Sequence, residues 1–143
     1  MVLKRKKFFV VLQGIITIMV SSLIFAYINS LFFVEESTNT EGINAAIEDN
    51  YIRVILPLLL SPVLEELIFR KWIPNTFQDF IGRKGSIIFS NSLFAFFHFD
   101  LFFIPYLFNG LVYSYIYEKT NDIRASILAH ILYNLFVFLL TFI

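Results

Sequence analysis

The chain has no cysteine, few charged residues and only two histidines, and each shortage excludes a class of chemistry. Without cysteine it can form no disulfide, carry no thiol nucleophile and hold no cysteine-ligated metal. Charged residues make up 15% of the chain, whereas soluble domains contain roughly a quarter. The net charge of zero gives no electrostatic reason to expect a nucleic-acid partner. Any imidazole chemistry depends on His98 and His130.

Hydrophobic residues are abundant instead, at 58% of the 143 residues, and the mean hydropathy is +0.75. The 19 Phe add bulk without polar atoms, which suits a surface in contact with lipid. We predict an all-α fold, a polytopic membrane helix bundle of about five transmembrane helices in a single domain, residues 1–143. The expected spans are residues 8–34, 51–73, 86–99, 105–117 and 125–143.

Local features refine these spans. The first is too long for a signal peptide and is expected to be an uncleaved anchor helix. Pro57 and Pro62 lie inside the second, where a missing N–H and a steric clash predict a kink or a local opening. Residues 76–81 are expected to form a short interfacial helix. The third span is short, so we expect it to end at mid-depth or to bend back before Pro105.

Charge distribution predicts the orientation in the cell membrane. The acidic loop, Glu35–Asn50, contains no Lys or Arg, and Arg53 is the one basic residue next to it. The remaining basic residues fall at 4–7, 70–84, 119 and 124. Since cytoplasmic loops are enriched in Lys and Arg, a five-span chain would place its N-terminus in the cytoplasm and its C-terminus outside.

The ionisable residues inside the apolar segments are the candidates for function. Glu65 and Glu66 lie in an almost wholly apolar stretch, where a carboxylate is costly and is usually retained for a purpose. His98 and His130 each lie in a further apolar segment, and Asn134 shares a helix face with His130. At about 1.5 Å of rise per residue, the two glutamates and His130 reach a similar depth, Asn134 lies one turn deeper and His98 deeper still, all between the cytoplasmic surface and the middle of the bilayer. We expect them to line one cavity open to the cytoplasmic side.

The spacing also predicts which polar residues share a helix face. Glu66 and Arg70 are four residues apart and can form an ion pair. Glu65 projects about 100° away from Glu66 on a helix, so the two carboxylates are expected to have different roles. On the fourth span, Tyr106, Asn109 and Tyr113 form a polar stripe.

These residue types favour water activation. A carboxylate beside an imidazole can act as a general base toward water, and a second imidazole with an amide can stabilise an oxyanion. No serine lies in a Gly-x-Ser-x-Gly context, and Asp79 and Asp100 lie at span edges, which disfavours serine and aspartyl mechanisms. Structural roles are the alternative: an ion pair for Glu66, snorkelling for Glu65, packing hydrogen bonds for the histidines and interhelical bonding for Asn134.

Three motifs carry a family resemblance. Glu65-Glu66-x-x-x-Arg70, Phe94-x-x-x-His98 and His130-x-x-x-Asn134 resemble, in order and spacing, the motifs of the CPBP (Abi) family of CAAX prenyl endopeptidase-like and bacteriocin-processing intramembrane proteases. The resemblance covers about residues 56–140. It implies a peptide substrate and the roles of the motif residues. Glu65 would activate water with help from His98, His130 and Asn134 would stabilise the oxyanion, and Glu66 and Arg70 would support the first motif.

Family members are described both as metalloproteases and as metal-independent glutamate proteases. An alternative zinc set would be Glu65, His98 and His130. The chain has no His-Glu-x-x-His pair, and neither histidine has an obvious carboxylate partner in sequence, so we expect no cofactor. The chain is shorter than typical members, which favours peptide maturation or bacteriocin self-immunity over a prenylated substrate. A non-catalytic immunity or scaffolding membrane protein remains the alternative function.

Overall fold

The computed structural model describes residues 2–32 and 55–140, and this part of the chain is helical, with short connections and no strand. The all-α prediction is therefore confirmed. Two short segments, η2 and η3, are π-helical. The elements in order are α1 (Val2–Phe32), η2 (Leu56–Leu60), α3 (Ser61–Glu66), η3 (Leu67–Trp72), α4 (Ile73–Phe96), α5 (Ile104–Thr120) and α6 (Ile123–Leu140).

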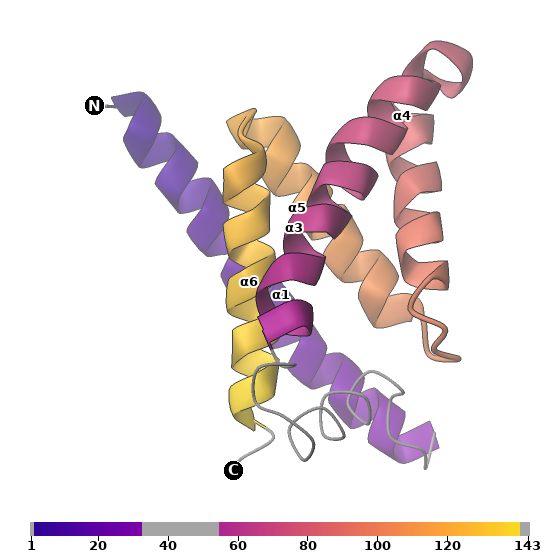
Figure 1. Ribbon diagram of the computed structural model, residues 1–143. Coiled ribbons are helices and arrows are strands. Elements are labelled where there is room, and N and C mark those ends of the chain that lie inside the picture. Colours follow the sequence, from indigo (N-terminus) through magenta and orange to yellow (C-terminus); the bar gives the residue numbers. More distant parts are fainter. Residues whose placement is uncertain (1, 33–54, 141–143) are drawn as a thin grey trace.

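Helices α1, α5 and α6 pack together, and the chain from η2 to α4 forms a helical hairpin beside them (Figure 1). Helix α5 contacts α1, α4 and α6, and it therefore lies at the centre of the bundle. The hydrophobic core around it is a cluster of four buried residues: Ile18 of α1, Tyr113 and Ile116 of α5, and Ala129 of α6. A Cβ atom at Gly110 would lie 2.5 Å from Asn91 Oδ1, so glycine allows α5 to approach α4 closely.

The hairpin bends at Gly82, whose φ of 73° and ψ of 162° break the helix inside α4. Glycine adopts this positive φ without steric cost. The first arm runs without interruption from Leu56 to this bend. The expectation of a separate interfacial helix at 76–81 is therefore wrong: those residues are helical, but they extend the preceding helix. The reason is that Pro74 does not break this helix, because η3 widens just ahead of it.

The first π-helical segment ends at Leu60, two residues before Pro62. Ser61 N–H donates to Leu56 O, one residue further back than in an α-helix. Pro62 has no N–H, so the carbonyl of Pro57 loses the donor that would continue the π-helical pattern. Asn134 Nδ2 on α6 donates to Pro57 O instead, at 3.1 Å. The local opening predicted for this segment is confirmed.

The second π-helical segment repeats this arrangement at Pro74. Ile73 N–H donates to Ile68 O, and Pro74 cannot donate to the carbonyl of Phe69. Ser90 Oγ, on the returning arm of the hairpin, donates to Phe69 O at 2.6 Å. In both segments a side chain from another helical arm therefore satisfies the carbonyl that a proline leaves without a donor.

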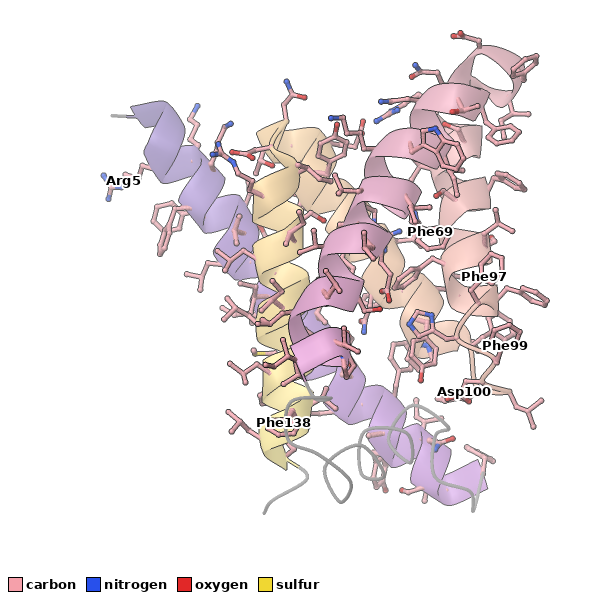
Figure 2. The ribbon with its side chains drawn as sticks, viewed as in Figure 1. Arg5, Phe69, Phe97, Phe99, Asp100 and Phe138 are labelled. Carbon is pink, nitrogen blue, oxygen red and sulfur yellow. The ribbon has the colours of Figure 1, made fainter. Side chains whose placement is uncertain are left out.

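The described helices match the predicted spans in order. Helices α1 and α6 carry the first and fifth spans, α5 the fourth, and the two hairpin arms the second and third. Within residues 2–32 and 55–140, two stretches are long and apolar enough to cross a membrane, Arg5–Phe32 and Ile123–Leu140. Helix α4 ends at Phe96, and the connection after it turns outward, with Phe97 and Phe99 pointing away from the bundle (Figure 2). The acidic loop and residues 51–54 lie outside the described residues.

Candidate active site

Glu66 is the centre of a buried polar network. Its side chain is fully buried, and its carboxylate contacts three partners, one from η3 and two from α6. Arg70 Nε lies 3.3 Å from Oε2, which confirms the predicted ion pair. Ser126 Oγ of α6 also donates to Oε2, and His130 Nδ1 of the same helix lies 3.0 Å from Oε1. Both carboxylate oxygens are therefore occupied.

Arg70 connects this carboxylate to the hairpin and to α5. Arg70 Nη1 donates to Asn91 Oδ1 at 2.9 Å, and Asn91 Nδ2 donates to Ser114 Oγ of α5 at 2.9 Å. The guanidinium lies over the ring of Phe94, 4.4 Å from its centroid. A buried charge needs a paired charge and hydrogen bonds to offset its desolvation. Glu66 provides the paired charge and Asn91 one hydrogen bond, whereas Nη2 has no hydrogen-bond partner among the described residues.

Glu65 differs from Glu66 in exposure and in contacts. Its side chain is 26% exposed, and its carboxylate accepts a hydrogen bond from Ser61 Oγ at 2.6 Å. The other oxygen, Oε2, lies 3.7 Å from His130 Nε2. That distance is too long for a direct hydrogen bond and leaves one carboxylate oxygen open to a water or a substrate group. The two neighbouring carboxylates thus have different surroundings, as their angular separation predicts.

His130 lies between the two carboxylates. Its Nδ1 faces Glu66, and because a carboxylate only accepts, Nδ1 carries the proton of this hydrogen bond. Nε2 then faces Glu65 and accepts a proton, or donates one when the ring is an imidazolium. The sequence shows no obvious carboxylate partner for either histidine, but the structure gives His130 one. Glu66 is that partner, and it is 64 residues away in the sequence.

His98 lies in the turn just after α4. Its Nδ1 is 2.7 Å from the carbonyl oxygen of Phe94, which only accepts, so Nδ1 is protonated and Nε2 is free to accept. The Phe94 ring packs edge-on against both imidazoles, with centroid distances of 4.6 Å to His98 and 6.0 Å to His130. Within the described contacts, no hydrogen bond joins His98 to Glu65.

The predicted site residues therefore fall into three groups. Glu65, Glu66, Arg70 and His130 form one contact network. His98 approaches that network across the Phe94 ring. Asn134 lies on the same helix as His130, and its Nδ2 donates to the carbonyl of Pro57.

No group of three His, Asp or Glu side chains within residues 2–32 and 55–140 is arranged to hold a metal ion. The alternative zinc set of Glu65, His98 and His130 does not form such a group. Nδ1 of each imidazole is engaged, with Phe94 O at His98 and with Glu66 at His130.

Sequence reasoning missed three contributors to the network. Ser61 and Ser126 lie four residues before Glu65 and His130, so helical spacing could have placed each on the right face. Asn91 shares a face with His98, but it binds Arg70. Which partner Asn91 binds depends on how closely two helices approach each other. The spacing of residues along one helix gives no information about that distance.

Comparisons with a family model and with individual proteins agree on one family of membrane peptidases. Residues 47–136 match the family described as type II CAAX prenyl endopeptidase Rce1-like. YdiL of Bacillus subtilis, a proposed membrane peptidase, is 31% identical over 103 residues, which cover 71% of this chain and 42% of YdiL. The membrane-embedded CAAX protease MroQ of Staphylococcus aureus is 32% identical over 108 residues, 71% of this chain and 44% of MroQ. The chain thus spans less than half the length of these relatives. No solved structure matches it.

Proposed function

The chain belongs to the type II CAAX prenyl endopeptidase Rce1-like family, and from this premise we propose that it is an intramembrane endopeptidase in which Glu65 activates the attacking water. One observation carries the proposal. Glu66 is fully buried and has both oxygens occupied, whereas Glu65 is partly exposed and has one oxygen facing His130 Nε2 at 3.7 Å. Glu65 is therefore the carboxylate that can meet a water and a substrate.

The reaction follows from these positions. Glu65 takes a proton from a water molecule, and the water oxygen attacks the carbonyl carbon of a peptide bond. The unprotonated Nε2 of His98 can accept the second hydrogen bond of that water and so orient it. The proton held by Glu65 then passes to the amide nitrogen, the C–N bond breaks, and a carboxylic acid and an amine are released.

The oxyanion formed during attack needs hydrogen-bond donors. His130 supplies Nε2–H when both of its ring nitrogens carry a proton, while its Nδ1 stays hydrogen-bonded to Glu66. An Asn side chain has two N–H groups. One Asn134 N–H serves Pro57 O, which leaves the other available for the oxyanion. Asn134 would then combine a structural and a catalytic role.

A non-catalytic role, in bacteriocin self-immunity or as a membrane scaffold, is the second candidate. One observation favours it: Glu66, Arg70, His130 and Asn134 all join different helical elements. Such bonds could hold the bundle together without any reaction. The two candidates differ in whether the purified protein cleaves peptides.

The test is cleavage by the full chain reconstituted in lipid vesicles. Membrane-associated peptides are added, and their fragments are identified by mass spectrometry. We expect cleavage that strong chelators leave unchanged, because the water is activated by a carboxylate. The negative control is the same preparation inactivated at Glu65. Inhibition by chelators that added zinc reverses would instead support the zinc set, and the absence of any fragment would support the non-catalytic role.

The proposed location is the cell membrane, crossed several times with the N-terminus in the cytoplasm. The N-terminal end of α1, the bend at Gly82 and the α5–α6 connection lie at one end of the bundle (Figure 1). Arg83 near the bend forms an ion pair with Glu118 of α5, and Lys7 lies near enough for its charge to act on Asp122. The basic residues at these three places therefore gather at one end, as a cytoplasmic face requires.

Single-cysteine labelling tests this orientation, because the chain has no cysteine of its own. Asn39→Cys in the acidic loop should react with an impermeant thiol reagent added outside the cell, and Lys84→Cys should react only after the membrane is opened. The cysteine-free parent is the blank. The reverse pattern would reject both the orientation and a cytoplasmic opening of the site.

A further inference from the structure

Two tyrosines of α5 each lie flat against one of the two histidines. The rings of Tyr106 and His98 are stacked with centroids 4.2 Å apart and planes 30° apart. The rings of Tyr113 and His130 are stacked at 4.5 Å and 20°. The two tyrosines are seven residues apart, so they lie two turns apart on one face of the helix. The family motifs include neither of them.

Both imidazoles are held in the same way. Each uses Nδ1 for one hydrogen bond, to Phe94 O at His98 and to Glu66 at His130. Each also meets the edge of the Phe94 ring. A single hydrogen bond leaves a ring free to pivot about the bond, and pivoting would change the direction of Nε2. A parallel aromatic ring restricts that movement, because tilting the imidazole would lose the stacking contact.

The two tyrosines are themselves held in place by different means. Tyr106 OH donates to Asp100 Oδ2 at 3.0 Å, and Asp100 Oδ1 accepts a hydrogen bond from the Phe102 amide. This anchors the tyrosine to the connection that also carries His98. Tyr113 is 1% exposed and is held by packing, with the Arg70 guanidinium 5.6 Å from its ring centroid. Its hydroxyl has no hydrogen-bond partner among the described residues.

We infer that Tyr106 and Tyr113 are positioning residues, each fixing the ring plane of one histidine so that its Nε2 points at the reacting groups. The inference rests on the proposed function for its catalytic consequence. It assigns α5, which carries no motif residue, the task of aligning two side chains from α6 and from the turn after α4. The close approach at Gly110 sets the distance of α5 from α4 on which this alignment depends.

Histidine NMR tests the geometry directly, since the chain has only two histidines. The full chain is labelled with 15N-histidine, and His98→Gln and His130→Gln assign the two sets of ring signals. Tyr106→Leu should shift the His98 signals and leave those of His130 in place. Tyr113→Leu should do the reverse. Tyr115→Leu is the matched control, because Tyr115 lies on the same helix but is 42% exposed. It should move neither set.

Peptide cleavage tests the consequence. Each Leu variant should lower kcat by about tenfold to a hundredfold with little change in KM, since misplacement by about 1 Å can have that effect. Tyr113→Phe keeps the parallel ring, so it should restore both the His130 signals and the rate relative to Tyr113→Leu. Tyr106→Phe should restore less, because it loses the bond to Asp100. The Phe variants also decide the case if Tyr113→Leu does not fold.

Different failures overturn different statements. Unmoved histidine signals in Tyr106→Leu would show that stacking does not fix the ring. Shifted signals with an unchanged rate would remove the catalytic role of the tyrosines. A loss in Tyr113→Phe as large as in Tyr113→Leu would assign the effect to the hydroxyl. A wild-type protein that cleaves nothing would overturn the proposed function and the catalytic consequence, while the NMR shifts would still decide whether the tyrosines hold the two rings.

Discussion

Replacing Glu65 with Gln is expected to abolish peptide cleavage while the protein stays folded. Gln keeps the size of the side chain, and its amide oxygen can still accept the hydrogen bond from Ser61 Oγ. It cannot take a proton from water. A general base contributes about 10²–10⁴ in rate, so the loss should fall in that range. Cleavage measured in vesicles, with thermal unfolding as the check on folding, decides the matter.

The informative comparison is Glu66→Gln at the neighbouring position. Glu66 does not face the proposed water, so this change should lower the rate less than Glu65→Gln. It should lower stability more, because Arg70 loses its buried counter-charge. Full activity in Glu65→Gln would rule out this base. Equal losses of activity in both variants, with both folded, would contradict the separate roles of the two carboxylates.

Replacing Arg70 with Leu is expected to be the most destabilising single change in the network. It would leave the Glu66 carboxylate fully buried and without its cation. Removing one partner of a buried ion pair typically costs about 3–5 kcal/mol. The free energy of unfolding in detergent micelles, measured with denaturant, should fall by that amount.

Two further variants sharpen this expectation. Arg70→Lys keeps the positive charge but loses the geometry of the bond to Asn91, so it should lie between wild type and Arg70→Leu. Arg124→Leu breaks the ion pair with Asp122, in which the arginine side chain is 86% exposed. It should leave stability unchanged, because exposed ion pairs contribute little. A stable Arg70→Leu protein would contradict the need of the buried Glu66 carboxylate for this counter-charge.

Contacts within one helix could be predicted from the sequence. The Glu66–Arg70 pair follows from a spacing of four residues, and the different surroundings of Glu65 and Glu66 follow from the turn between neighbouring residues. The same rule applies to the stripe of Tyr106 and Tyr113. The helical period decides which residues share a face, and this does not depend on how the helices pack against one another.

Contacts between helices could not be predicted in this way. The carboxylate partner of His130 is 64 residues away, and the acceptor of Asn134 is 77 residues away. In a different packing of the helices, His130 and Asn134 could each have found a hydrogen-bond partner on another helix. The predicted second span ends at residue 73, directly before Pro74, whereas the helix continues past this proline. Whether a proline breaks or only widens a helix depends on a donor from elsewhere, here Ser90.

Each proline makes a distant side chain necessary. Pro62 leaves a carbonyl that Asn134 serves, and Pro74 leaves one that Ser90 serves. In a relative with another residue at the position of Pro62, a backbone N–H would return to the carbonyl of residue 57, and the structural need for Asn134 would disappear. The same holds for Pro74 and Ser90. Substitutions at each pair should therefore be correlated across the family. An asparagine that persists at 134 where the proline is lost would then mark selection for the reaction alone.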